Sequence, residues 1–402
     1  MTNKQQQIPA IRFNGFTDTW EQRKLGDDKD VRDGTHDSPK YHKEGHPLVT
    51  SKNLNDYGLD MTDVSLISDA DFEAINKRSK VDNGDILFGM IGTIGNPVIV
   101  DRSDFAIKNV ALIKEGGDIP NRFLIQLLKS SVFEKYIRNE NAGNTQKFLG
   151  LSKIREFIFF APTTEEQIKI ATFFKQLDDT IALHQRQLNN YNQLKKSMMQ
   201  KIFNQEFRFK DGNGNDFPEW EKYELGEVIT EYNGKTEVNN QYPPLTSSRR
   251  GLFLQEDYFN RQIASKDTTG YNIVPYGYFT YRHMSDDLEF YFNINYLIPN
   301  GIVSTLYPVF TTKDNLDSNF LQIILNNGKE FKQFAILQKQ GGSRTYMYLS
   351  KLKNLMLNIP CYIEQQKIAH FVLAIDKKIS IEERQIELLQ KQKNWFMQKI
   401  FL

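Results

Sequence analysis

The strongest constraint on the fold is an internal repeat with an offset of 198 residues. The pentapeptide MQKIF occurs at residues 199–203 and again at residues 397–401. Two further phrases recur at the same offset, Leu-Ser-Lys at 151–153 and 349–351 and Glu-Gln-x-Lys-Ile-Ala at 166–171 and 364–369. A third, Trp-Glu-x-x-x-Leu-Gly, opens each half at 20–26 and 220–226, an offset of 200 residues. A period near 200 residues is too long for a solenoid repeat and predicts the tandem duplication of one unit.

Each copy of this unit is predicted to contain a globular domain followed by a long helix. A chain of 402 residues is long enough for two domains. The repeat boundaries predict four segments, namely a first globular domain at 1–162, a first helix at 163–206, a second globular domain at 207–359 and a second helix at 360–402. Thr163, followed three residues later by Glu166, is typical of a capping box at the start of the first helix.

The two helical segments carry apolar residues that alternate in steps of three and four, which is the heptad pattern of a coiled coil. The predicted seam residues are Ile170, Phe174, Leu177, Ile181 and Leu188 in the first helix, and Ile368, Val372, Ile375, Ile379, Ile386 and Leu389 in the second. Polar residues interrupt both seams at equivalent steps, His184 with Glu382 and Lys195 with Lys393. We expect the helices, each roughly 60 Å long, to pair antiparallel. The alternative is that each helix packs only on its own domain.

The sequence of each domain predicts a mixed α/β unit with short strands. Turn-then-strand patterns occur at residues 83–88 and 276–281. Amphipathic patterns predict one helix over residues 123–136 and an equivalent helix over residues 320–334. A glycine-containing loop follows each of these helices. The expected fold class is therefore α+β: two homologous mixed α/β domains separated by a long antiparallel two-helix coiled coil, in a pseudo-twofold tandem duplication.

Composition excludes several classes of protein. No stretch of about 20 apolar residues is present, so we expect no membrane span. The first residues lack the apolar core of a signal peptide, and the single cysteine, Cys361, excludes an internal disulfide. We therefore expect a cytoplasmic protein. The net charge is +1, so a nucleic-acid-binding role would need basic groups focused on one face or partners that supply phosphate contacts.

The sequence shows no motif of catalysis or cofactor binding. The glycines of residues 89–95 are not spaced as in a dinucleotide-binding loop, and no phosphate-binding lysine motif occurs. His42 and His46 lie four residues apart in a loop without nearby cysteine, which is a poor metal site. We expect no metal, no cofactor and no catalytic residues.

Taken together, the repeat, the paired helices and these phrases resemble the specificity subunit of type I restriction–modification systems over nearly the whole chain. The stretch Asp-Gly-Thr-His-Asp-Ser-Pro at residues 33–39 adds to the resemblance. The resemblance implies two target-recognition domains that each read one half of a split site in double-stranded DNA. It also implies helices that dock two methyltransferase (modification) subunits, joined in the full complex by restriction/translocase subunits. The subunit itself would be non-catalytic, with no cofactor, because the adenine is flipped into a partner's pocket.

The candidate DNA-contacting residues are those whose side chains suit base edges, since arginine or lysine reads guanine, asparagine or glutamine reads adenine, and small hydroxyls contact several base edges. In the first domain they are His36, Lys40, Tyr41, Thr50, Ser51, Lys52, Asn53, Asn144, Thr145, Gln146 and Lys147. In the second they are Ser247, Ser248, Arg249, Arg250, Arg282, His283, Ser343, Arg344 and Tyr346.

Two other functions stay open from the sequence. One is a coiled-coil adaptor without a DNA role. The other is the recognition part of a fused restriction–methylation enzyme. Against the second, the Asn/Asp-Pro-Pro-Tyr/Phe signature of methyltransferases is missing, because Tyr242 rather than an amide or acid precedes Pro243 and Pro244.

Overall fold

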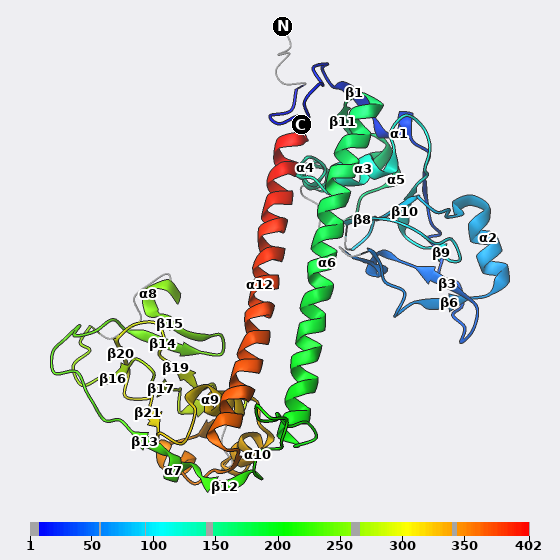
Figure 1. Cartoon of the computed structure of the whole chain (residues 1–402). Helices are drawn as coiled ribbons and strands as arrows, with labels where there is room; N and C mark the ends of the chain where they lie inside the picture. Colours follow the sequence, from blue (N-terminus) through cyan, green and yellow to red (C-terminus); the bar gives the residue numbers. More distant parts are fainter. Residues whose placement is uncertain are drawn as a thin grey trace. The chain divides into compact units, whose positions relative to one another are not determined.

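The structure is a computed structural model that describes residues 8–55, 58–92, 94–141, 148–258, 266–339 and 344–401. Contacts between residues divide the chain into two compact units. The first unit comprises Met1–Gln187 with Glu382–Leu402, and the second comprises Leu188–Ile381. Each unit therefore contains one globular domain and a part of each of two long helices, which are green and red in Figure 1.

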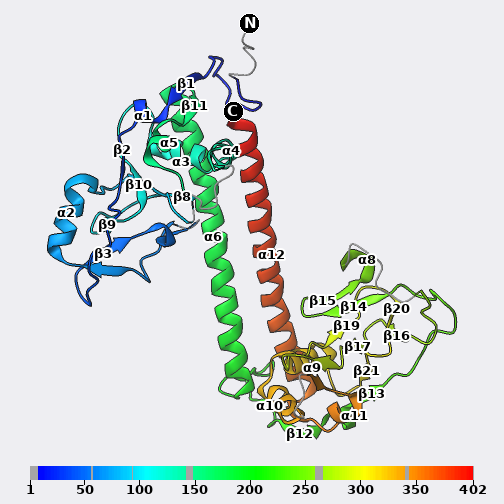
Figure 2. The ribbon, with the colours of Figure 1, turned by 180° about the vertical axis from the view of Figure 1, so that it is seen from behind.

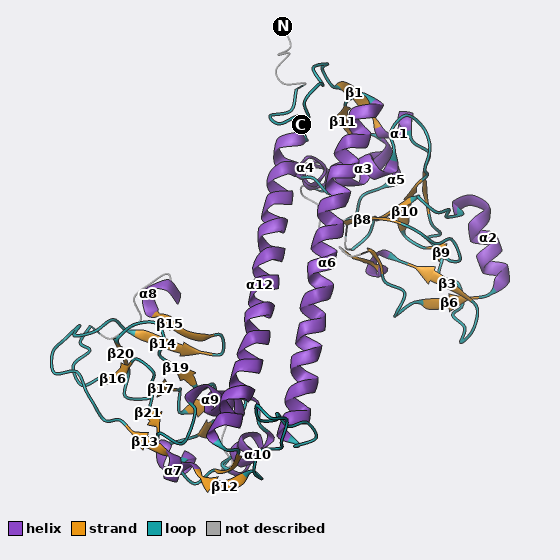
Figure 3. Cartoon of the chain, viewed as in Figure 1, coloured by secondary structure: helices purple, strands orange, loops and turns teal. Residues whose placement is uncertain are grey.

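The domain of the first unit combines short strands and helices (Figure 3). Its main sheet is antiparallel, with strand order β2–β10–β7–β8; a smaller sheet has the order β6–β3–β9, and β1 pairs with β11. The strands are β1 (Glu21–Lys24), β2 (Val31–Asp33), β3 (His46–Val49), β4 (Leu54–Asn55), β5 (Gly58–Leu59), β6 (Ser65–Ile67), β7 (Ile86–Gly89), β8 (Gly95–Ile99), β9 (Ala106–Ile107), β10 (Val110–Ile113) and β11 (Ile158–Ala161). The helices are α1 (Leu25–Asp28), α2 (Asp69–Ser79), α3 (Asn121–Leu128), α4 (Ser131–Glu140) and α5 (Leu151–Arg155), with a 3-10 turn η1 at Ser51–Asn53.

The domain of the second unit repeats this plan. Its main sheet has the order β13–β21–β17–β19, and β12 pairs with β23 as β1 does with β11. The strands are β12 (Glu221–Glu224), β13 (Ile229–Glu231), β14 (Leu245–Ser248), β15 (Gly251–Leu254), β16 (Asn272–Pro275), β17 (Phe279–Thr280), β18 (Met284–Ser285), β19 (Asn293–Ile294), β20 (Asn300–Val303), β21 (Val309–Thr312), β22 (Thr345–Tyr346) and β23 (Met356–Ile359). The helices are α7 (Leu225–Val228), α8 (Gln255–Tyr258), α9 (Ser318–Asn327), α10 (Lys329–Leu337) and α11 (Leu349–Leu352).

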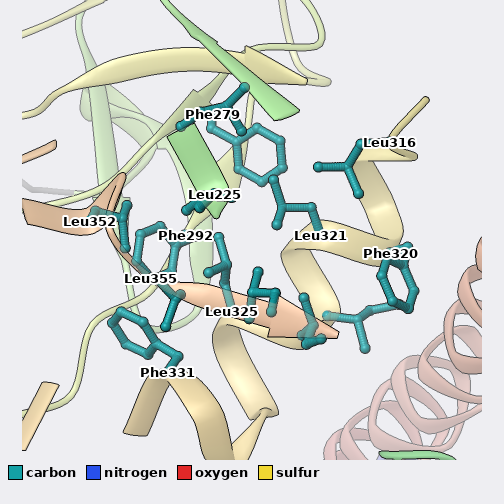
Figure 4. Packing of buried hydrophobic residues seen from close by; sticks show 14 of the residues in the cluster. Leu225, Phe279, Phe292, Leu316, Phe320, Leu321, Leu325, Phe331, Leu352 and Leu355 are labelled. Atoms are coloured by element: carbon teal, nitrogen blue, oxygen red, sulfur yellow. The ribbon is translucent and has the colours of Figure 1, made fainter. Parts of the chain in front are cut away.

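The core of the second domain lies between the main sheet and α9, as Figure 4 shows with Phe279, Leu321 and Leu325. The two cores contain equivalent aromatic pairs. Trp220 meets Phe320 edge-on at 6.2 Å between ring centroids, and in the first unit Trp20 meets Phe123 at 6.4 Å. The tandem duplication of a mixed α/β domain, predicted from the sequence, is confirmed by this shared framework.

The predicted helices at residues 123–136 and 320–334 were wrong in one respect, because each is two helices. Ser130 separates α3 from α4, and its hydroxyl accepts the amide of Val132 to cap the second helix. Gly328 both ends α9 and starts α10, in an extended conformation. Serine favours this capping position, so a new helix starts here although the amphipathic pattern of the sequence runs on across the break.

Two long helices follow the domains, α6 (Thr164–Phe203) and α12 (Tyr362–Ile400). In Figures 1 and 2 the part of α6 and the part of α12 that belong to the same unit lie side by side. Among the helices of the described residues, none combines the length and the apolar character that a membrane crossing requires.

An ion pair between a largely buried arginine and a fully buried glutamate ties the start of each long helix to the segment at the beginning of its domain. The guanidinium of Arg12 donates two hydrogen bonds, of 2.8 and 2.7 Å, to the carboxylate of Glu166, and Arg208 binds Glu364 in the same way at 3.2 and 2.8 Å. Glu166 is therefore bound by an arginine, whereas the capping-box pattern with Thr163 predicted a bond to the helix start. The fork of arginine matches a carboxylate and satisfies its charge inside the protein.

Within each unit the two long helices run antiparallel. In the first unit Asp178 lies 2.6 Å from Lys393, and Nδ1 of His184 lies 2.6 Å from Glu382. In the second unit Lys195 lies 2.5 Å from Asp376. Polar groups on the apolar stripe and beside it thus make contacts between the helices within each unit.

The apolar seam residues lie along this contact with different degrees of burial. The buried ones are Ile170, Phe174, Ile368, Val372, Ile375 and Ile386, and the half-buried ones are Leu177, Ile181, Leu188, Ile379 and Leu389. Ile170 and Phe174 in α6, and Ile368, Val372 and Ile375 in α12, are the first predicted seam residues of their helices, and Ile386 is buried farther along α12.

We expect replacement of Ile375 by aspartate to destabilise the protein far more than the same change at Leu373. Ile375 is 5% exposed, whereas Leu373, two residues away on the same helix, is 41% exposed. Burying a charge without a partner adds to the loss of apolar packing, so Ile375→Asp should lower the free energy of unfolding by roughly 3 kcal/mol or more. Denaturant unfolding measures both variants, and equal losses would contradict the assignment of Ile375 to the buried stripe.

Candidate nucleic-acid interface

In the first domain the chain after β2 forms a polar loop around His36. The two ring nitrogens of His36 lie 2.8 Å from Oδ1 of Asn109 and 2.9 Å from Oδ2 of Asp33. Asp33 also accepts a 2.7 Å hydrogen bond from Arg78 on α2. Because both ring nitrogens face oxygen acceptors, the protonated ring fits this place best, and the bonds to Asn109 and then Asp33 raise the pKa of His36.

The turn η1 adjoins this loop. The hydroxyl of Ser51 donates to the backbone oxygen of Asn109 at 3.4 Å, and the exposed Lys52 lies 3.2 Å from Asp63. Thr50 starts the turn and hydrogen-bonds the Asn53 side chain. Lys40 and Tyr41 are exposed farther along the polar loop.

In the second domain the hairpin of β14 and β15 turns at Arg249 and Arg250, and both side chains are exposed. The hydroxyl of Ser248 donates to the Gly251 carbonyl across the turn at 3.0 Å. The guanidinium of Arg249 pairs with Asp287 and, at 3.0 Å, with Glu289. The guanidinium of Arg250 lies over the ring of Tyr258, 5.0 Å from its centroid.

A second pair of strands, β18 and β22, carries the other predicted residues of this domain. Arg344 precedes β22 and lies 2.8 Å from Asp286, which follows β18. Tyr346 in β22 is 38% exposed and stacks on Tyr348 at 5.9 Å between centroids. Arg282 is exposed just before β18.

Three predicted DNA-contacting residues are buried, and we assign them a supporting role. The amide of Asn53 donates to the carbonyls of Asp60 and Asp63, which leaves it 3% exposed. Ser247 is 9% exposed and accepts a bond from Asn293, and His283 is 7% exposed and stacks on Tyr348. Five further predicted residues lie outside the described residues: Asn144, Thr145, Gln146, Lys147 and Ser343.

Sequence reasoning missed several residues that the fold brings to these surfaces. In the first domain, Arg78 reaches Asp33 from α2, and the ammonium of Lys108 lies 2.6 Å from the hydroxyl of Ser38. In the second, the acidic residues that hold Arg249 and Arg344 were missed. Only the basic character of Arg78 and Lys108 could have singled them out, because their partners are distant in the sequence.

The described residues contain no group of three or more histidine, cysteine or acidic side chains placed to hold a metal ion. In the two loop clusters, arginine, lysine, histidine, tyrosine and small hydroxyls gather together with the acidic residues that pair with the basic ones. The basic, aromatic and hydroxyl groups hydrogen-bond base edges and phosphates and stack on bases. The chemistry of both clusters therefore favours nucleic-acid recognition.

Comparison with known proteins decides the family. The family model described as "Type I restriction modification DNA specificity domain" matches twice, at residues 17–193 and at residues 218–391. The chain belongs to the type I restriction–modification DNA specificity family. The two matches of the type I specificity model coincide with the two copies of the sequence repeat, which confirms the resemblance noted in the sequence.

Full-length relatives of the type I specificity family support this assignment. Two come from Methanocaldococcus jannaschii: "Putative type I restriction enzyme MjaX specificity subunit" is 24% identical over 98% of this chain and 95% of its own, and "Type I restriction enzyme MjaIX specificity subunit" is 21% identical over 95% and 92%. The fold resembles the crystal structure of a type I S subunit from M. genitalium, with a TM-score of 0.62, 14% identity and coverage of 98% of this chain and 99% of the other.

We expect Asn109→Gly to lower the pKa of His36. Asn109 has a positive φ of 56°, which glycine adopts readily, so the change removes the acceptor without straining the backbone. Titration of His36 followed by NMR measures the pKa in both proteins. An unchanged pKa would contradict the role of Asn109.

The same pKa shift has a defined effect on stability. A raised pKa in the folded state stabilises the fold below the unfolded-state value of about 6.5. This contribution is lost as the pH rises through the folded-state pKa of His36. The stability difference between the wild type and Asn109→Gly should therefore shrink as the pH rises through that range.

Proposed function

We propose that this chain is the DNA-recognition subunit of a type I restriction–modification complex and that each domain reads one half of a bipartite target in double-stranded DNA. The observation that carries the proposal is the repeated framework with different loops. The sheets, the aromatic pair and the arginine–glutamate pair recur in both units, whereas the polar clusters differ in sequence and shape. Two modules of one design with different surfaces suit two different half-sites.

In the first domain we assign DNA contact to exposed and half-buried groups around the loop after β2 and the turn η1. They are His36, Lys40, Tyr41, Thr50, Ser51 and Lys52, joined by Arg78 and Lys108. In the second domain we assign it to the tip of the β14–β15 hairpin and to the β18–β22 pair. They are Ser248, Arg249, Arg250, Arg282, Arg344 and Tyr346. Lysine and arginine in both sets provide the bonds that guanine accepts.

We assign the paired helices two tasks, to set the distance between the two domains and to dock two methyltransferase subunits. Their outward faces carry exposed apolar residues such as Leu183, Ile381 and Leu388. Because the net charge of this chain is only +1, we expect the methyltransferase and restriction/translocase subunits to supply much of the contact with DNA phosphates. Methyl transfer would take place in a methyltransferase subunit, so this chain would recognise the DNA sequence without a catalytic role.

The direct test is to express the chain with its methyltransferase partner in a host free of adenine methylation and to map modified adenines by long-read sequencing. The expected result is one motif with two defined halves separated by a constant number of unread base pairs. If the complex assembles but methylates without sequence preference, the chain is a coiled-coil adaptor and the proposal fails. If the chain methylates DNA alone, it is part of a fused enzyme.

Single substitutions should separate the half-sites. We expect Arg344→Ala to change recognition of one half-site only, and His36→Ala to change recognition of the other only. The loss of one good base contact corresponds to about 1–3 kcal/mol of discrimination, or at least several-fold in the relative methylation of altered sites.

Arg102→Ala is the matched control, because Arg102 is also an exposed arginine paired with an aspartate, Asp104, but lies outside both clusters. It should leave the motif unchanged. If Arg344→Ala and His36→Ala altered the same half-site, the assignment of one half-site to each domain would be wrong.

A further inference from the structure

A four-residue segment of the second domain places three carboxylates among the arginines assigned to DNA contact. We call this segment the acidic loop; it has the sequence Asp-Asp-Leu-Glu at residues 286–289 and follows β18. Asp286, Asp287 and Glu289 are all exposed. Carboxylates repel phosphates, so their presence on a DNA-contacting surface needs a physical reason.

Arg249 contacts two carboxylates of the acidic loop and the ring of the nearby Tyr291. Asp287 binds one terminal nitrogen of the guanidinium, and Glu289 lies 3.0 Å from the other. The guanidinium also lies over the ring of Tyr291, 5.9 Å from its centroid, and the hydroxyl of Tyr291 donates to Glu289 at 3.3 Å. An arginine held by two carboxylates and a ring has a much narrower range of orientations than a free surface arginine.

The acidic loop is itself fixed by its own hydrogen bonds. One carboxylate oxygen of Asp287 accepts the hydroxyl of Ser285 at 2.8 Å and the amide of Glu289 at 3.2 Å, while its other oxygen faces Arg249. Hydrogen bonds from Arg249 and then Ser285 lower the pKa of Asp287 to about 2. Asp287 therefore keeps its negative charge at neutral pH.

A second arginine reaches the same loop from another part of the chain. Arg344, ahead of β22, lies 2.8 Å from Asp286, whereas Arg249 belongs to the β14–β15 turn. The acidic loop thus gathers arginines from two segments about a hundred residues apart in the sequence. Ion pairs this exposed contribute little to stability, which favours a role in binding over a role in folding.

An arginine held between carboxylates affects the binding of target DNA and of non-target DNA differently. A phosphate that approaches the surface meets the repulsion of the acidic loop, so contacts that any sequence can make are weakened. A base edge with two acceptors still gains from an arginine whose orientation is already fixed, because less side-chain entropy is lost on binding. Guanine offers two such acceptors in the major groove.

We propose that the acidic loop is a specificity-determining element, in which Asp287 and Glu289 position Arg249 to read a guanine of the second domain's half-site and disfavour binding to other sequences. The proposal rests on the proposed function and deepens it. Asp287 and Glu289 are positioning residues that act through Arg249. A guanine is accordingly expected in the half-site that the second domain reads.

The test compares the complex of the full chain and its methyltransferase subunits with the same complex carrying Asp287→Asn and Glu289→Gln together. Binding is measured by fluorescence anisotropy, over a range of salt concentrations, to two duplexes. One carries the motif mapped for the wild type, and the other has the second half-site scrambled. The double variant should bind the scrambled duplex several-fold more tightly, and the preference for the intact motif should fall about tenfold or more.

Asp63→Asn is the matched control, because Asp63 holds the exposed Lys52 in the first domain and its loss changes the charge in the same direction. It should leave discrimination at the second half-site unchanged. Arg249→Lys keeps the charge but loses the two-donor fork, and it should abolish the preference for guanine at one position of that half-site.

Two results would overturn the proposal while leaving the proposed function intact: an unchanged preference in the double variant, or a second half-site without guanine. The first of these results includes a loss of affinity for both duplexes by the same factor, which a merely structural role would produce. A wild-type complex without any sequence preference would overturn the proposed function and this proposal with it.

Discussion

The antiparallel pairing of the two long helices is the interaction on which the rest of the structure depends. Because the chain is duplicated, both helices carry the same pattern, with an aspartate at positions 178 and 376 and a lysine at positions 195 and 393. Parallel pairing in register would place lysine against lysine and aspartate against aspartate. Antiparallel pairing instead brings each aspartate to a lysine, at 2.6 and 2.5 Å. The charges on and beside the stripe thus favour this direction and register, as polar positions do in other coiled coils.

This pairing acts on the domains through the buried arginine–glutamate pairs. Each glutamate lies near the start of a long helix, so the entry of the chain into its domain is tied to the helix that leaves it. A buried charge that loses its partner is costly. The frame, meaning the shared sheets, long helices and arginine–glutamate pairs, therefore tolerates little change. The loops around His36 and Arg249 carry no such constraint, because exposed ion pairs contribute little stability. Recognition surfaces can therefore differ between the domains while the frame stays the same.

Much of the frame could be predicted from the sequence, because a repeat and a heptad period are visible without knowledge of contacts. The breaks at Ser130 and Gly328 were missed, since the amphipathic pattern runs through them. The Arg12–Glu166 pair joins residues far apart in the sequence, and a local capping pattern offered a competing interpretation of Glu166. Residue chemistry named Arg249 and Arg344 as candidates, but the same chemistry named Asn53, Ser247 and His283, which are buried. Burial and the partners of each arginine depend on tertiary packing, so only the structure separates these two groups.

We propose that the paired helices set the distance between two domains that read DNA independently. Lengthening the helices tests it most directly, by inserting one heptad after Gln187 and one at the equivalent position after Gln385, which keeps the seam in phase. Each helix then grows by about 10 Å, or roughly three base pairs of DNA. Mapping of methylated adenines should show both half-sites unchanged and a spacer longer by about that number. An unchanged spacer, or altered half-sites, would contradict the account.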